Sequence, residues 1–114
     1  MVQYQSSALD ATFGALSDPT RRAIIAKLGE RECAVSELAE PFDMSLTAVA
    51  KHLRVLEGAG LVRREKHGRI VTCRLDAARL RDAAAWIAHY ERFWTTRLDA
   101  LGHYLERSSK QEPP

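Results

Sequence analysis

Residues 44–62, MSLTAVAKHLRVLEGAGLV, combine short polar side chains with positive charges at helical spacing. Serine and threonine hydroxyls and a helix N-terminus can hydrogen-bond phosphates or base edges, and lysine and arginine can donate to guanine or to phosphate. Threonine and alanine methyl groups can contact the methyl group of thymine. The residues predicted on this face are Ser45, Thr47, Ala48, Lys51, His52 and Arg54. Together they have the chemistry of a surface that contacts double-stranded DNA.

A second basic segment follows within residues 61–75. Its basic side chains are Arg63, Arg64, Lys66, His67 and Arg69. They could lie along a DNA backbone or in the minor groove. Residues 45–74 hold seven Lys and Arg against two Glu, a net charge of +5, so the rest of the chain carries −3 of the total of +2. A locally basic segment in a nearly neutral protein indicates contact with a polyanion, and a solvated charged face without a partner is the alternative.

Two short helices joined by a turn must position the first segment. Ser45 is suited to cap a helix over residues 45–59, and Gly60 can end it in a left-handed conformation. The buried stripe of this helix is predicted at Leu46, Val49, Leu53 and Leu56. Ser36 is suited to cap a preceding short helix over residues 36–41. The pair is a helix-turn-helix, in which the second helix enters the DNA major groove.

The chain before this unit predicts two further helices. Residues 1–7 are expected to fray. One face of a short helix follows at Leu9, Phe13 and Leu16. Asp18 can cap the next helix, Pro19 fits its first position, and Gly29 is expected to end it.

The chain after this unit predicts a hairpin and a long helix. Two strands are expected over residues 61–66 and 70–75, joined by a turn at Gly68. The apolar face of the hairpin would pack on the domain through Leu61 or Val62, Ile70 and Thr72. Asp76 can cap a helix that runs to about residue 107, because apolar residues recur there every three or four positions. Residues 108–114 are expected to form a disordered tail.

Length and composition limit the class of protein. The chain has 114 residues, of which 46% are hydrophobic, so it suits one domain with a small core, to which a second chain could add burial. The predicted fold is mainly α with a small β-hairpin wing, a winged helix-turn-helix domain over residues 1–107. No secretory signal and no apolar run near the roughly 18 residues of a membrane helix is visible, which favours a cytoplasmic protein. The sequence shows no phosphate-binding loop, no Ser/His/Asp order and no carboxylate pair, so no motif in it indicates an enzyme.

The chain resembles the ArsR-type winged-helix repressors of bacteria over about residues 9–105, in the segments ALSDPTRRAIIAKL and VSELAEPFDMSLTAVAKHLRVLEGAGLVRREKHGRIVTCRL and in the terminal helix. The resemblance implies a homodimeric, often autoregulatory repressor that binds an imperfect palindromic operator. It also implies a dimer interface formed by the first and last helices. The interface residues we predict are Leu9, Phe13, Leu16, Trp86, Tyr90, Phe93, Trp94, Leu98, Leu101 and Leu105. Independently, the aromatic stripe of the last helix is too large for a small core to hide, although an intramolecular core is the alternative.

The chain departs from the metal-sensing members of that family. Those members place a Cys-x-Cys pair where this chain has Ala34 and Ser36, and Cys33 lies beside these positions alone. Thiolate metal sites need two or three sulfurs. His103 and Glu106 match one half of the family's other metal site, but the other half is missing. We therefore expect no metal site and no cofactor. His103 and Glu106 are only weak candidates for metal ligands.

Two alternatives remain open. A winged-helix module that binds protein instead of DNA would be expected to lose the basic residues that this chain keeps. A metal- or redox-responsive repressor would need a non-standard site, and a redox pair of Cys33 and Cys73 would need their Cα atoms within about 7 Å. Buried, inert thiols are the simpler interpretation. The signal could be a small molecule, a partner protein or the concentration of the protein itself.

Overall fold

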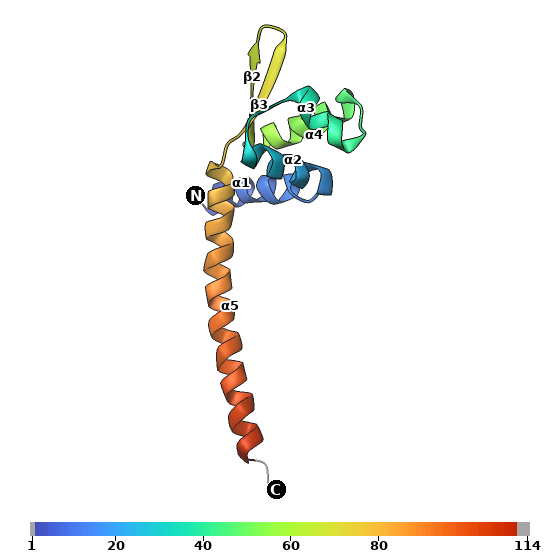
Figure 1. The fold of residues 1–114 in the computed structure, drawn as a ribbon. Helices are drawn as coiled ribbons and strands as arrows, with labels where there is room; N and C mark the ends of the chain where they lie inside the picture. Colours follow the sequence, from blue (N-terminus) through green and yellow to red (C-terminus); the bar gives the residue numbers. More distant parts are fainter. Residues whose placement is uncertain (1, 112–114) are drawn as a thin grey trace. The chain divides into compact units, whose positions relative to one another are not determined.

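The computed structural model describes the backbone of residues 2–111 and the side chains of residues 7–109. It confirms a mainly helical fold with a hairpin (Figure 1). The chain divides after Ala83 into two compact units. In chain order the elements are α1 (Val2–Ala15), α2 (Pro19–Glu30), β1 (Cys33–Ala34), α3 (Val35–Ala39), the 3-10 helix η1 (Glu40–Phe42), α4 (Leu46–Gly58), β2 (Val62–His67), β3 (Ile70–Leu75) and α5 (Ala78–Gln111).

The core of the first unit is built around α4. Val49, Leu53 and Leu56 on this helix are fully buried, and α1, α2 and α3 each pack against it. Burial of one such aliphatic side chain contributes roughly 1.5–3 kcal/mol. The other members of this core are Ala15, Ile24, Leu28, Cys33, Leu38, Ala39, Ala59, Leu61, Val62 and Cys73. Because one face of α4 is buried in this way, the opposite face points to solvent.

The sheet is antiparallel, with strand order β1-β3-β2. His67 is opposite Ile70, so Gly68 and Arg69 form a two-residue turn. Gly68 has φ +63°, the left-handed conformation that such hairpin turns require. The turn end of the hairpin extends beyond the helices of the first unit (Figure 1). Strand β1 was not predicted, because two residues carry no strand pattern.

Three predicted helix ends are confirmed. The Ser45 hydroxyl accepts the backbone N–H of Ala48 at 3.1 Å, which caps α4. The Asp18 carboxylate accepts the backbone N–H of Arg21 at 3.0 Å, which caps α2. Gly60 has φ +77°, so it ends the α4 segment in the left-handed conformation. These contacts are local in sequence, which is why the sequence predicts them.

Two other predicted helix ends are wrong. Helix α2 continues through Gly29, which does not adopt a positive φ, to Glu30, and the extended backbone of Arg31 ends it. Helix α3 begins one residue before Ser36, so this serine lies inside the helix and is not its cap. The Glu37 carboxylate accepts the backbone N–H of Ala34 at 3.0 Å instead, and this contact holds the first turn.

The terminal helices are longer than expected. Helix α1 includes residues 2–7, which were expected to fray, and α5 includes residues 108–111, which were expected to belong to a disordered tail. Neither stretch contains the glycine or proline that would interrupt a helix. Met1 and residues 112–114 lie outside the described residues, so the expectations for them stay predictions.

Two apolar residues that were predicted to be buried are exposed. Leu46 is 57% exposed and Ile70 is 59% exposed. Leu46 is the first residue of α4, where the Ser45 cap rather than burial holds the helix. Ile70 is next to the hairpin turn, beyond the core, whereas Leu61 and Val62 at the base of the hairpin are buried as predicted.

Candidate nucleic-acid interface

Helix α4 presents an exposed polar face opposite its buried stripe. Thr47, Lys51 and Arg54 recur there every three or four residues and are all exposed. Ser45 is exposed at the N-cap, and Ala48 is partly buried beside it. The N-terminal residues of a recognition helix are those that reach base edges in the major groove. The structure therefore brings most of the predicted contact residues of this helix to one accessible face.

Four cations of α4 and the hairpin have unengaged side chains. Lys51 and Arg54 belong to α4, and Lys66 and Arg69 belong to the hairpin. Within the described part of the chain, none of these side chains takes part in a hydrogen bond or an ion pair. All four are exposed. Their charges can therefore neutralise phosphates directly, with release of condensed counterions.

Two other arginines of the hairpin are held by carboxylates. Arg63 Nε donates to Asp76 Oδ2 at 2.8 Å. This hydrogen bond, with a second from the backbone N–H of Ala78, lowers the pKa of the Asp76 carboxyl below its ordinary value. Arg64 forms an ion pair with Glu57 near the end of α4. These arginines can meet DNA only while sharing their charge with a carboxylate.

The strand β2 residue Glu65 lies between the side chains of His67 and Arg74. His67 Nε2 is 3.4 Å from one carboxylate oxygen, and Arg74 Nη2 is 3.5 Å from the other. All three side chains are about half exposed or more. The positive charge that the hairpin offers to a polyanion is therefore concentrated on Lys66 and Arg69.

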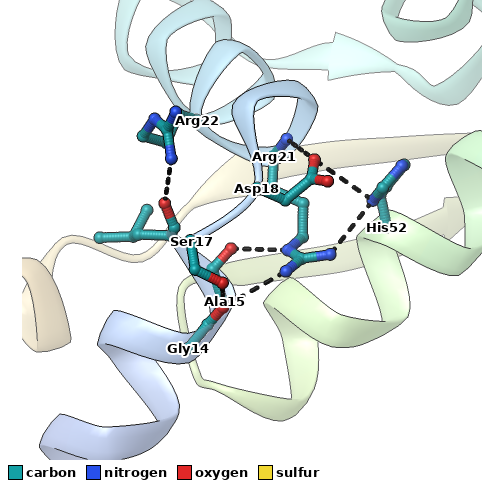
Figure 2. A network of polar contacts seen from close by, with 8 residues as sticks. Gly14, Ala15, Ser17, Asp18, Arg21, Arg22 and His52 are labelled. Atoms are coloured by element: carbon teal, nitrogen blue, oxygen red, sulfur yellow. Dashed lines mark hydrogen bonds and ion pairs between the residues drawn. The ribbon is translucent and has the colours of Figure 1, made fainter.

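His52 lies at the edge of the polar face, with its side chain only 20% exposed. Its Nδ1 is 3.4 Å from Arg21 Nη1 and 3.9 Å from Asp18 Oδ2 (Figure 2). Arg21 also donates to the carbonyl oxygens of Gly14 and Ala15, at 3.3 and 2.6 Å. No role was predicted for Arg21, although it lies in the segment ALSDPTRRAIIAKL that carries the family resemblance.

The residues predicted to form a dimer interface differ in exposure. On α1, Leu9 and Leu16 are partly buried, Leu16 against the core, and Phe13 is 36% exposed. The predicted residues of α5 are 43–62% exposed in the single chain: Trp86, Tyr90, Phe93, Trp94, Leu98, Leu101 and Leu105. An exposed apolar surface of this kind is typical of a protein-interaction site.

The two cysteines are brought together in the sheet. Cys33 on β1 is directly opposite Cys73 on β3, and both are buried free thiols. Opposed residues of antiparallel strands have Cα atoms about 4.5–5.5 Å apart, within the range of a disulfide. Burial raises the pKa of the Cys73 thiol to about 11. Burial therefore keeps the Cys73 thiol protonated at neutral pH.

The two weak metal candidates share a face of α5. His103 and Glu106 line one shallow depression with Ala100 and Arg107. Among the residues that the structure describes, no group of three or more His, Cys, Asp or Glu side chains is placed to hold a metal ion.

A helix-turn-helix whose second helix exposes cations, followed by a basic hairpin, defines a winged helix-turn-helix DNA-binding protein. Residues 16–65 match the family described as a helix-turn-helix domain. The HTH-type transcriptional regulator Rv2034 of Mycobacterium tuberculosis is 37% identical over 97 residues, which cover 85% of this chain and 88% of that protein. The transcriptional repressor SdpR of Bacillus subtilis is 28% identical over 82 residues, covering 72% and 91%.

Solved structures agree with these relatives. An ArsR family transcriptional regulator is 40% identical with a TM-score of 0.74, covering 79% of this chain and 93% of its own. An ArsR-like transcriptional regulator from Rhodococcus sp. RHA1 is 35% identical with a TM-score of 0.72, covering 91% and 96%. The chain belongs to the ArsR family of winged helix-turn-helix transcriptional regulators. Its named relatives are regulators and not enzymes. Within the described residues, no helix is both long and apolar enough to span a membrane.

Proposed function

We propose that this protein is a homodimeric repressor that binds an imperfect palindromic operator, with one α4 helix in each half-site. The observation that carries the proposal is the exposure of the large apolar side chains of α5, 43–62% from Trp86 to Leu105. A second copy of the same helix offers a matching apolar surface. A two-fold dimer would place two recognition helices roughly 34–36 Å apart, one turn of DNA.

The proposed contacts follow from exposure and charge. Lys51 and Arg54 would donate to guanine edges or phosphates in the major groove, and Lys66 and Arg69 would contact the backbone beside the wing. The other proposed contact residues are Ser45, Thr47, Ala48, His52, Arg63, Arg64 and His67. The first helix would extend the dimer interface through Leu9, Phe13 and Leu16.

The proposed repressor does not use the thiolate metal site found in metal-sensing members of the family. Ala34 and Ser36 occupy those positions and carry no ligand sulfur. Its signal is then a small molecule, a partner protein or its own concentration. A duplex that the metal-stripped, reduced protein selects from a random-sequence pool is the probe for every DNA-binding experiment below.

The test combines oligomeric state with DNA binding. We expect the wild-type protein to sediment as a dimer and to prefer the palindromic duplex over a single half-site. Trp94→Glu places a charge in the apolar stripe and should give a monomer whose affinity for the palindrome falls about a hundredfold, because two half-sites no longer bind together. Thr96→Glu adds the same charge on another face of α5 and should leave both properties unchanged.

Three results would overturn the proposal. If the wild-type protein were a monomer that bound one half-site as tightly as the palindrome, the proposed dimer would be excluded. A Trp94→Glu protein that stays dimeric would remove the α5 stripe from the interface. Binding that ignores sequence and only falls steeply with salt would reduce the interaction to backbone attraction.

A further inference from the structure

A single guanidinium ties the recognition helix to the corner between α1 and α2. Arg21 Nε donates to the carbonyl oxygen of Ala15, Nη2 donates to that of Gly14, and Nη1 reaches His52 on α4 (Figure 2). Gly14 and Ala15 end α1, where backbone carbonyls have no partner within the helix. Arg21 thus bonds two carbonyls at the end of one helix and contacts a side chain of another, and the Gly14 carbonyl also accepts the N–H and the hydroxyl of Ser17.

The 3.4 Å contact with Arg21 favours the tautomer of His52 in which Nδ1 is the acceptor. A guanidinium has only donors, so the Nδ1 atom that receives its N–H must be unprotonated. The neutral imidazole then carries its proton on Nε2. Asp18 is the other charged group at this nitrogen, but 3.9 Å is too long for a hydrogen bond, and its carboxylate accepts the backbone N–H of Arg21.

The free nitrogen of His52 is directed away from this network. Figure 2 shows Nδ1 facing Arg21 and Asp18, with the second ring nitrogen on the far side of the ring. No residue of the described chain bonds Nε2. His52 follows the exposed Lys51 and lies at the flank of the polar face of α4. Most hydrogen bonds from proteins to DNA go to phosphate oxygens and sugars, so a phosphate is the acceptor that we assign to Nε2.

We infer that His52, as a neutral imidazole, donates Nε2–H to an operator phosphate, and that Arg21 is the positioning residue that holds it in this tautomer. The inference rests on the proposed function, because it assigns a contact within the proposed DNA complex. It distinguishes His52 from Lys51 and Arg54, which bring charge. A neutral donor binds a phosphate without releasing a counterion, so it adds affinity without adding salt dependence.

The first experiment compares three substitutions of His52 on the selected duplex at several salt concentrations. The amide of Gln reaches the position of Nε2, whereas the amide of Asn reaches only that of Nδ1. We expect His52→Gln to bind within about threefold of wild type, and His52→Asn and His52→Leu to bind about tenfold more weakly. The slope of log affinity against log salt should be the same for all four proteins.

The second experiment tests the role of Arg21 through a double-mutant cycle in DNA binding. Arg21→Lys keeps the charge, but the lysine ammonium cannot contact two carbonyls and an imidazole at once as the planar guanidinium does. It should weaken DNA binding in the wild-type background and have no further effect in the His52→Leu background. A purely structural arginine would lower affinity equally in both backgrounds. Long-range ¹H–¹⁵N NMR should show His52 protonated at Nε2 in the wild type, with this preference reduced in Arg21→Lys.

Each contrary result points to one step. An unchanged affinity for His52→Leu, or equal affinities for Gln and Asn, would overturn the phosphate contact. A salt slope lower by about one in His52→Leu would make His52 a cationic contact instead. An Nδ1–H tautomer or an additive cycle would remove Arg21 from the mechanism while the proposed function stands. Failure of the wild type to select any duplex would overturn both.

Discussion

Arg64 on strand β2 and Glu57 near the end of α4 form an ion pair in which each side chain is about one third exposed, 29% and 32%. The pair joins the wing to the recognition helix, the two elements that carry the exposed cations. Partial burial makes the pair less screened by water than an ion pair on the open surface. If either partner is removed, the remaining charge is left half-buried without a counter-ion.

Glu57→Gln should therefore lower the free energy of unfolding by about 1 kcal/mol, measured by urea denaturation. Glu65→Gln is the matched control, because Glu65 pairs with His67 and Arg74 where all side chains are about half exposed or more. Its effect should stay within about 0.5 kcal/mol. If both variants lost the same free energy of unfolding, partial burial would not make the pair of Arg64 and Glu57 stronger than an exposed one.

Lys51→Ala should weaken binding to the selected duplex about tenfold and reduce the salt slope by about one, because one cation no longer meets the DNA. Arg54→Ala should act in the same direction. Arg107→Ala removes an equal charge from an exposed position on α5 and should change neither quantity. Affinity unchanged in both α4 variants would exclude this helix from the interface.

The recognition helix shows which features the sequence could predict. The Ser45 cap and the left-handed Gly60 depend on neighbouring residues along the chain, and both are confirmed. The apolar spacing identified Val49 and Leu53 as buried residues. The same spacing failed at Leu46, because periodicity gives the direction of a side chain but not whether another element covers it.

Leu46 and Leu53 make a matched pair for this difference. Leu53→Ala removes a fully buried side chain and should lower the free energy of unfolding by about 2–5 kcal/mol. Leu46→Ala removes the same atoms at a position that is 57% exposed and should cost less than about 1 kcal/mol. Denaturation curves of the two variants measure the loss in the free energy of unfolding. Similar losses would mean that another part of the protein covers Leu46 in solution.

The candidate site was predictable as a set of residues but not as a set of contacts. Charge and helical spacing identified the cations of α4 and the hairpin. They could not show that Arg63 is held by Asp76 while Lys66 has no described partner, because this depends on where β2 and β3 end beside other elements. The contact between Arg21 and His52 spans 31 residues and exists only once α2 packs against α4.

The Asp18 cap should make stability depend on pH in acid. The backbone N–H of Arg21, which Asp18 accepts, lowers the pKa of this carboxyl below its ordinary value of 3.8. A lowered pKa contributes stability that is complete above the ordinary value and is lost as pH falls through the lowered one. Asp18→Asn keeps a capping acceptor but does not titrate there. The melting temperature of Asp18→Asn should fall less than that of the wild type between about pH 5 and pH 2. Equal falls of the two melting temperatures over this range would contradict the prediction.

The opposed thiols of Cys33 and Cys73 should be slow to react in the folded protein. Both are buried, and burial raises the pKa of Cys73 to about 11, so little Cys73 thiolate exists at neutral pH. We expect a disulfide reagent to modify the native protein far more slowly than the urea-unfolded protein, and the native rate to rise with pH toward that value. Cys73→Ser should leave one slowly reacting thiol. Rapid native modification of both would show that the short strand β1 opens readily, and the cross-strand pair would then be within reach of oxidants.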